Sequence, residues 1–499
     1  MKKFAGLVVV LAALVLGGYY AMGVATEHTL RKNLASVNQS NGLVVDIAEY
    51  NRGWFKSNAL LNWTLHVPAR VNKTADGQSQ ALPAQDYKMQ MPVTVYHGPV
   101  IFANDGVHFG LGYGKTNLTL PPEYSDKFKQ KFTDDSTQPH VDLSLFVNYL
   151  NNSQVEMAVP EFKLTAKEGG AHFEWLGMDS KMDVSSSGDK VEGDLDINGM
   201  QITKDDTTAV IGQVDTEYKL HKTDGNYYIG DAGITLPSVV VKNKDKQLFE
   251  LNDFTANSSS NIEDGLFSSH FQSSVDKIIA HDKTYGPGNL EMSVRNLDAS
   301  VWAQVNHLVS QMQQGTDAEK QQALLALLPE LPKLFSKGAE FEISELSFGM
   351  PEGTFEGNLM LSLPAGQFSN PFELVQKIKG SGKLKIPAEV LRQALDASNR
   401  TKLATQQQAA TTETPAAVPV DSTTAAAPVP AATTPAAAPA VTTPEMAQQI
   451  TSQTTQQLTN LVQSGLLVQQ GSDYTIDLSL DNGQLVINGK PFNPTMLKF

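Results

Sequence analysis

Residues 191–199 read VEGDLDING, and this stretch decides the fold of the chain. Its apolar residues Val191, Leu195 and Ile197 alternate with acidic residues at positions 192, 194 and 196. Alternation with a period of two places one face of a β-strand against an interior and the other face in water. The Asn198-Gly199 pair that follows is typical of a tight turn, so we expect this strand to end in a β-hairpin.

The same pattern recurs on both sides of this stretch. Apolar and polar residues alternate over 61–67, 107–113 and 239–241, and turn residues such as those at 481–483 (DNG) separate the runs. A string of Gly, any residue, Leu, any residue and an aliphatic residue is expected to open a strand at five positions: Gly193, Gly288, Gly357, Gly382 and Gly483. No βαβ pattern is visible. The sequence therefore predicts a β-rich α+β fold with a long, curved, mainly antiparallel sheet.

Helices are few, and two of them predict an αα-hairpin at about residues 298–336. Asp298 is a suitable N-cap for a helix that runs to about residue 314, and a second helix is expected over 316–335. Pro387 opens a third helix, because the missing N–H of proline is harmless in a first turn.

The segment 404–444 is dominated by Ala, Thr and Pro and lacks large apolar side chains, which predicts a disordered linker. It separates a main β-rich domain, 28–403, from a C-terminal piece, 445–499. This piece is predicted to be an amphipathic helix followed by a β-meander. A lone helix with a few short strands is only marginally stable, so we expect it to pack back on the main sheet.

Residues 1–27 predict a membrane anchor. Residues 4–25 carry no charge, and as a helix they would be about 33 Å long, enough to cross a hydrocarbon core of about 30 Å. Lys2 and Lys3 predict a cytoplasmic N-terminus and an exported remainder. A cleavable signal peptide is the competing interpretation, since Gly23-Val24-Ala25 resembles a cleavage site. The apolar run exceeds the about 7–15 residues of a usual signal core, which favours a retained anchor.

Composition narrows the compartment and the partners. The formal net charge of −15 argues against nucleic acid, because an acidic protein repels a phosphate backbone. The chain has no cysteine, which excludes disulfides, thiolate metal sites and lipoprotein attachment. A large extracellular eukaryotic domain would usually contain disulfides, so these features favour the bacterial periplasm.

Catalytic and metal motifs are weak. The run from Asp194 to Asp205 approaches a calcium-binding loop, but its last position is Asp where Glu is usual, and a β-hairpin explains the pattern better. Two S-x-x-K matches, at Ser187 and Ser274, lack the companion motifs of an acylating enzyme. We therefore predict no catalytic, cofactor-binding or metal-binding residues, and a protein that is not an enzyme.

Four residues are candidate ligand or turn contacts: Arg52, Trp54, Tyr96 and His97. Arg52 lies between aromatic residues and could hold a phosphate or a carboxylate. The alternative is an arginine stacked on Trp54 or Tyr50 to stabilise a turn. His97 precedes Gly98-Pro99, where a turn or packing role is the alternative to a ligand contact.

Short motifs along the chain resemble those of the YdgA-like family of bacterial inner-membrane proteins. They are the apolar N-terminus, YNRGWFKS at 50–57, YHGP at 96–99, NLD at 296–298 leading to Trp302, and NGQLVINGK at 482–490. The resemblance implies a single-pass protein of the Gram-negative inner membrane, with its bulk in the periplasm and no established activity. More distantly, the chain is similar to AsmA-like proteins, whose curved sheets are proposed to shield lipid chains.

Three functions remain open on the sequence. The leading expectation is an envelope protein that binds or shields a lipid against its sheet. The second is a scaffold that forms a homodimer or binds another protein. The third is an envelope hydrolase, for which a histidine and a carboxylate would have to converge in a pocket.

Overall fold

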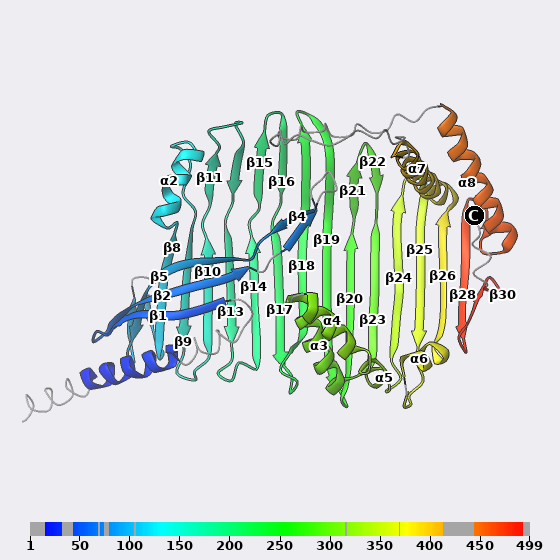
Figure 1. Cartoon of the computed structure of the whole chain (residues 1–499). Helices are drawn as coiled ribbons and strands as arrows, with labels where there is room; N and C mark the ends of the chain where they lie inside the picture. Colours follow the sequence, from blue (N-terminus) through cyan, green and yellow to red (C-terminus); the bar gives the residue numbers. More distant parts are fainter. Residues whose placement is uncertain are drawn as a thin grey trace, which may run out of the picture.

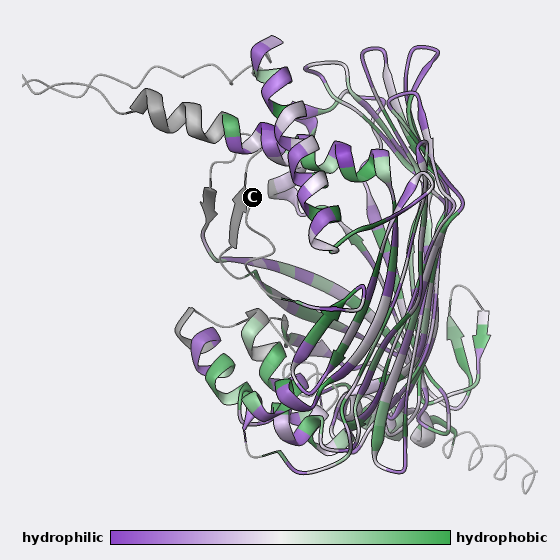
Figure 2. Ribbon diagram, turned by 90° about the vertical axis from the view of Figure 1, so that its right-hand side faces the viewer, coloured by the Kyte–Doolittle hydropathy of each residue, from purple (hydrophilic) through white to green (hydrophobic). Residues whose placement is uncertain are grey.

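A single β-sheet dominates the computed structural model, which describes residues 15–31, 43–67, 70–73, 79–103, 106–314, 317–368, 370–412 and 444–492. Twenty-six strands belong to this sheet, and the strand pairs are antiparallel. The sheet bends into a trough, with α3 to α5, α7 and α8 on its concave side (Figure 1, Figure 2). The predicted β-rich chain with a large antiparallel sheet is confirmed.

The strands follow one another along the chain as β1 (Leu43–Asn51), β2 (Lys56–Val67), β3 (Arg70–Lys73), β4 (Ser79–Leu82), β5 (Gln85–His97), β6 (Ile101–Ala103), β7 (Gly106–His108), β8 (Gly112–Thr119), β9 (His140–Val147), β10 (Ser153–Val159), β11 (Phe162–Thr165), β12 (His172–Trp175), β13 (Met178–Val184), β14 (Lys190–Ile197), β15 (Met200–Lys204), β16 (Thr207–Ile211), β17 (Val214–Lys222), β18 (Tyr228–Asn243), β19 (Lys246–Glu263), β20 (Leu266–Val275), β21 (Lys277–Ala280), β22 (Lys283–Tyr285), β23 (Gly288–Asp298), β24 (Glu340–Met350), β25 (Gly353–Ser362), β26 (Lys379–Pro387), β27 (Val468–Gln470), β28 (Asp473–Asp481), β29 (Gln484–Ile487) and β30 (Lys490–Pro491). The helices are a first one over residues 15–31, then α2 (Pro122–Lys131), α3 (Ala299–Gln314), α4 (Asp317–Leu327), α5 (Leu331–Leu334), α6 (Pro371–Lys377), α7 (Ala388–Thr412) and α8 (Pro444–Ser464).

A line of breaks crosses several neighbouring long strands, and we call it the crease. Its members interrupt the strands at Leu176-Gly177, Asn198-Gly199, Gly212-Gln213, Pro237, Asp253, Asp276 and Gly286-Pro287. At the crease Gly177, Gly199 and Asp253 have positive φ, a conformation that glycine tolerates and that other residues rarely adopt. Breaks of this kind bend a strand locally, and their alignment across the sheet accounts for its fold into a trough.

The hairpin predicted at Asn198-Gly199 is wrong, because these residues form part of the crease. β14 pairs with β13 and β17, whereas β15 pairs with β12 and β16, so the two strands continue one another instead of pairing. Asn198 donates its backbone N–H to Gly177 O, which joins the breaks of two adjacent strands. A positive-φ glycine serves a bend as well as a turn, and only the pairing partners distinguish the two.

The αα-hairpin lies on the concave side, over β18, β20 and β23 (Figure 1). The Asp298 carboxylate accepts hydrogen bonds from the backbone N–H groups of Ser300 and Val301, which confirms the predicted N-cap. Trp302 stacks on Phe267 of the sheet at 4.7 Å between ring centroids. The second helix is shorter than expected, because it breaks into α4 and α5.

The C-terminal piece lies against the main sheet. β28 pairs with β26 along its length, and α8 packs beside α7. Inside this contact Asn399 donates a 3.0 Å hydrogen bond to the Thr454 hydroxyl, and both side chains are buried. α7 runs to Thr412, so it occupies the first residues of the predicted linker, and residues 413–443 lie outside the described part of the chain.

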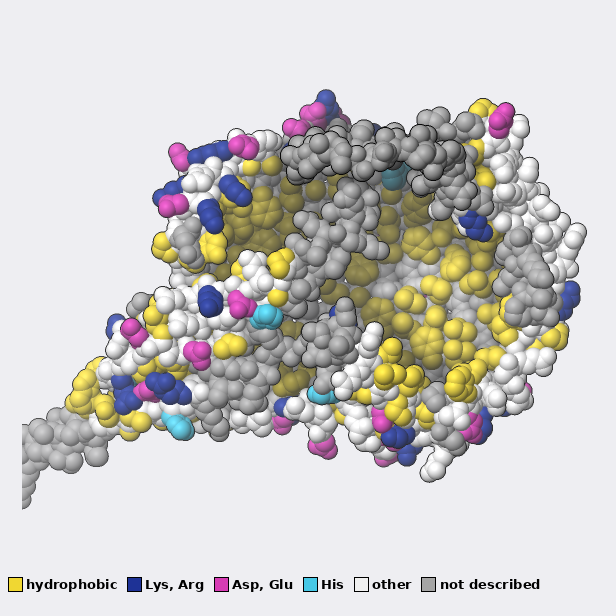
Figure 3. All heavy atoms as spheres, viewed as in Figure 1, with side chains coloured by type: hydrophobic (Ala, Val, Ile, Leu, Met, Phe, Trp, Pro, Cys, Tyr) yellow, Lys and Arg dark blue, Asp and Glu magenta, His cyan; other side chains and the backbone are white. Residues whose placement is uncertain are grey.

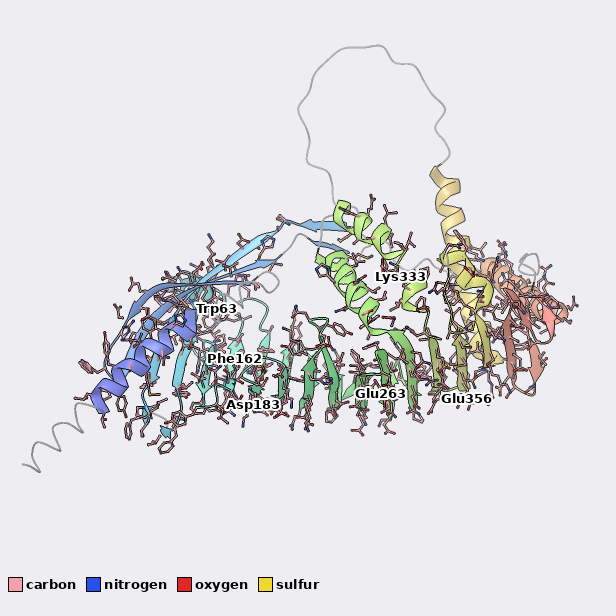
Figure 4. All side chains as sticks on the ribbon, turned by 90° about the horizontal axis from the view of Figure 1, so that it is seen from below. Trp63, Phe162, Asp183, Glu263, Lys333 and Glu356 are labelled. Atoms are coloured by element: carbon pink, nitrogen blue, oxygen red, sulfur yellow. The ribbon has the colours of Figure 1, made fainter. Side chains whose placement is uncertain are left out.

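The strands β1, β2 and β5 form an arm that crosses the concave side. β5 pairs with β8 only over Thr94–His97, and beyond that contact the arm leaves the sheet (Figure 1). The arm packs Leu61 and Met91 toward Leu118 and Leu143 of β8 and β9. Figure 4 places Trp63 on this arm, above the inner surface of the sheet.

Two smaller expectations are wrong. The alternating run 107–113 is not one strand, because it is divided between β7 and β8. Gly193, Gly357 and Gly382 lie within strands and do not open them. A Cβ at Gly193 would come within 2.7 Å of the Tyr218 hydroxyl, so the glycine makes room for a neighbour's side chain.

Of the predicted anchor, residues 1–14 lie outside the described part of the chain. Among the described residues, no helix has the length and apolarity needed to cross a membrane.

Candidate functional site

The concave face carries a continuous apolar surface, which we call the trough floor. Cross-strand partners share a face, so the pairing register identifies its members. One row crosses thirteen strands, from β9 to β28, without a charged residue: Leu145, Val155, Met182, Gly193, Tyr218, Ala232, Ser258, Phe271, Met292, Ile343, Leu359, Gly382 and Leu478.

The next row along the same strands is equally free of charge. It consists of Leu143, Met157, Ser180, Leu195, Thr216, Ile234, Ala256, Ser273, Leu290, Leu346, Gly357, Leu384 and Ile476. On the other side of the crease a third row is apolar as well: Phe162, Trp175, Met200, Ile211, Val239, Leu251, Ile278 and Tyr285.

The convex face has the opposite character. The residues between the first two floor rows include Glu156, Lys181, Asp194, Glu217 and Glu291, whose cross-strand pairing places them together on the outer side. Figure 4 accordingly shows Phe162 toward the inner side, and Asp183 and Glu356 projecting outward. The sheet is thus amphipathic across its whole width.

The trough is a hollow lined by hydrophobic side chains (Figure 3). The arm covers part of it at one end, α3 to α5 cover the lower middle, and α7 and α8 stand at the other end (Figure 1, Figure 2). Between them the floor is only partly covered: Ile234 is 38% exposed, and Ser258 beside it on the next strand is exposed. Most of the other floor residues are half-buried, so partly accessible apolar side chains extend across many strands, which is unusual for a monomeric soluble domain.

A second feature joins three of the four candidate contact residues: a socket that holds the helix of residues 15–31. Gly23 of this helix faces His97, and a Cβ at position 23 would lie 2.6 Å from His97 Cε1. The Tyr19 hydroxyl donates a 2.7 Å hydrogen bond to Val100 O, and the Thr26 hydroxyl bonds Leu111 O at 3.1 Å. The helix is therefore fixed to the domain along two turns.

His97 is the buried centre of the socket. Its Nε2 lies 3.0 Å from Ser57 Oγ, and both side chains are fully buried. Burial lowers the pKa of His97, and the positive charge of Arg52 acts in the same direction. A serine and a histidine within hydrogen-bond distance resemble part of a hydrolytic dyad, but the helix covers them, so no substrate can approach the serine.

Arg52 contacts the helix of residues 15–31. Its guanidinium forms an ion pair with Glu27, which also pairs with Arg31 at 2.9 Å. It lies 5.8 Å from the ring centre of Tyr20, so the aromatic partner is neither Trp54 nor Tyr50, the two residues considered from sequence. The hydrogen bond from Arg52 is the main cause that lowers the pKa of the Glu27 carboxyl, which therefore stays ionised at neutral pH.

Trp54 and Tyr96 are placed differently from each other. Trp54, in the turn between β1 and β2, lies 5.6 Å from Tyr20 between ring centres and is 56% exposed. Tyr96 is not part of the socket, because adjacent residues of a strand point to opposite faces and His97 takes the inner one. Its ring stacks on Tyr113 at 6.2 Å.

On the convex face, His270, Glu291, Arg295 and Glu342 line an open cavity of about 930 Å3. His270 Nε2 lies 3.7 Å from Glu291 Oε1, and the nearby Arg295 pairs with Glu342 at 2.6 Å. All of these side chains are more than 30% exposed, as in ordinary surface ion pairs. Asp194 of the calcium-like run lies in β14 and Asp205 in the turn after β15, and no metal-ligand cluster is present among the described residues.

Sequence reasoning missed the helix side of the socket, namely Tyr19, Gly23 and Glu27, and Ser57 beneath it. Gly23 lies in an apolar run that is already interpreted as a membrane segment, so the sequence gives no sign that this glycine contacts the domain. The floor rows could be foreseen strand by strand from the alternation, but their continuity depends on register.

Residues 1–495 match a protein family described as "Bacterial protein of unknown function (DUF945)". No curated protein matches the chain.

Proposed function

This chain belongs to the DUF945 family of bacterial proteins of unknown function, and from that premise we propose that it is a lipid-binding protein of the Gram-negative cell envelope. In this proposal it is a YdgA-like, single-pass inner-membrane protein with a cytoplasmic N-terminus, and the trough lies in the periplasm. The protein is not an enzyme: it holds the acyl chains of a lipid on the trough floor and shields them from water.

The continuous uncharged floor is the observation that carries the proposal. Thirteen strands spaced about 4.8 Å apart give a floor about 58 Å wide, whereas one acyl chain spans about 15 Å, half of a bilayer core. Apolar surface in water costs about 25 cal/mol per Å2, so a partly open floor of this size favours an apolar occupant. Small residues such as Ala232, Ser258 and Ser273 line its middle and leave depth for one.

A scaffold is the second candidate, because α4 and the turn that follows it expose apolar side chains that the floor does not explain. Leu324, Leu325 and Leu328 are 49%, 69% and 44% exposed. A second copy of the chain or another envelope protein could cover them.

Photocrosslinking in intact cells tests the proposal and separates the two candidates. Benzoylphenylalanine replaces Phe271, on the floor, or its neighbour Gln272, on the convex face, in the full chain. We expect phospholipid adducts by mass spectrometry at position 271 and none at 272. Protein crosslinks at 271 without lipid would favour the scaffold, and equal lipid labelling at both positions would refute a floor site.

A further inference from the structure

The surface that surrounds the helix socket is unusually apolar for the outside of an acidic protein. We call it the rim, and it consists of the exposed tips Trp54, Phe55, Phe102, Val107, Phe109 and Leu150, each between 52% and 77% exposed. These residues come from three segments: the β1–β2 turn, the stretch from β6 to β8, and the β9–β10 turn. Single exposed apolar residues are common, but a cluster of this kind marks an interaction surface.

Contacts hold the three segments together around the helix. Phe55 packs edge-on to Tyr19 at 4.9 Å, and the backbone N–H of His97 bonds Phe55 O at 3.1 Å. The Tyr149 hydroxyl donates to Pro99 O, and the backbone N–H of Leu111 bonds Val147 O at 2.8 Å. The rim is thus one surface, built where the helix leaves the domain.

The charge of the rim differs from that of the chain. Residues 98–111 and 148–152 contain one acidic residue, Asp105, and no lysine or arginine, and the β1–β2 turn at 52–55 contributes Arg52 and no acidic residue, although the chain carries a net charge of −15. Aromatic side chains prefer the boundary between lipid headgroups and hydrocarbon, and the scarcity of acidic groups removes repulsion from anionic headgroups.

The socket also shortens the segment available to span a bilayer. Tyr19, Gly23 and Thr26 contact the domain, so only residues 4–18 of the uncharged run remain beyond it. Fifteen residues at 1.5 Å each give about 22 Å, less than the roughly 30 Å of a hydrocarbon core. An anchor of this length reaches across only if the domain itself approaches the hydrocarbon boundary.

We propose that the rim is a membrane-docking surface, which inserts into the headgroup region of the outer leaflet of the membrane that holds the N-terminal segment. The inference rests on the proposed anchor. It also orients the trough: the rim lies at the β8–β9 end of the sheet, so this end meets the membrane and the β28 end stands away from it (Figure 1). A lipid that leaves the bilayer would meet the floor first at β9.

The absence of cysteine allows a direct test with single labels in the full chain. F102C and L150C place an environment-sensitive nitrobenzoxadiazole dye on the rim, and F372C is the matched control. Phe372 in α6 is 81% exposed, lies toward the opposite end of the sheet, and is the same residue type as Phe102. The labelled proteins are reconstituted in nanodiscs of phosphatidylethanolamine and phosphatidylglycerol, with or without lipids that carry a doxyl quencher near the headgroup.

We expect a blue shift and strong quenching at positions 102 and 150, and neither at 372. Equal, water-like emission at all three positions, in protein that remains in the nanodisc, would overturn the docking surface and leave the anchor intact. Extraction of the full chain from cell membranes by alkaline carbonate is the separate check on the anchor. Release into the supernatant would refute the anchor itself.

Discussion

Gly23 in the N-terminal helix and His97 at the end of β5 are in such close contact that a Cβ at position 23 would lie 2.6 Å from the imidazole. The ring cannot retreat, because it is fully buried and lies 3.0 Å from Ser57 Oγ. The contact therefore leaves no room for a side chain at position 23 and holds the helix closely against the end of β5.

The first prediction concerns this contact. G23A should lower the thermal unfolding midpoint of the full chain in mild detergent, because overpacking costs about 1–3 kcal/mol against a gain of about 1 kcal/mol in helix propensity. G18A is the matched control, since nothing lies within 4 Å of a Cβ there. It should leave the midpoint unchanged or raise it. A G23A midpoint equal to that of G18A would contradict the close packing.

The second prediction concerns pH. Burial lowers the pKa of His97 in the folded protein. Below about pH 6.5, the imidazole is therefore protonated in the unfolded chain while it is still neutral in the folded chain. The stability that neutral His97 supports is complete above that pH and falls as the pH drops toward the lowered folded pKa. The H97Q side chain keeps a hydrogen-bond partner for Ser57 but does not titrate. In H97Q the thermal unfolding midpoint should therefore change less between about pH 7 and about pH 5 than in the unmodified chain.

The control for this titration is H66Q. His66 is on the same sheet, toward the exposed end of β2, where its Nδ1 lies 2.7 Å from Asp86 Oδ1 at the surface. H66Q should keep the loss of stability at acid pH. If H66Q reduces the change of the unfolding midpoint with pH and H97Q does not, the buried His97 is not the group that causes the loss of stability at acid pH.

The third prediction concerns the C-terminal piece. Asn399 of α7 donates 3.0 Å hydrogen bonds to Thr454 and Gln457 of α8, and its side chain is 2% exposed. N399A leaves a buried hydroxyl without this partner, at a cost of about 1–3 kcal/mol. We expect faster amide hydrogen exchange across α8. T455A, at an exposed position whose hydroxyl bonds only within α8, should leave the exchange unchanged.

Local chemistry predicted the parts of this fold that depend on neighbours in sequence. Alternation identified strands such as β2 and β14, and Asp298 was recognised as a cap because its carboxylate needs only the next three residues. Asn198-Gly199 was misinterpreted because a bend in a continuous strand and a hairpin turn make the same demand on backbone φ. The partners that decide between them, at residues 176–177 and 212–213, are not adjacent in sequence.

The socket could not be predicted from the sequence for the same reason. Arg52 and His97 were recognised as unusual, but the residues that contact them, Glu27 and Gly23, lie in or next to a segment whose apolarity already has an explanation. A glycine in an apolar helix gives no sign that its missing side chain accommodates an imidazole.

The last prediction concerns the trough floor, and it uses two adjacent residues of β19. Ser258 is the cross-strand partner of both Ala232 and Phe271 on the floor, whereas Asn257 points to the convex face. Both are exposed, so either position should accept a long side chain without loss of folding. S258R places a charge where an acyl chain would lie, and desolvating that charge costs several kcal/mol, so the lipid adduct to benzoylphenylalanine at position 271 should disappear. N257R should leave the adduct intact. Retention of the adduct in S258R, in protein with an unchanged unfolding midpoint, would show that lipid does not occupy the middle of the floor.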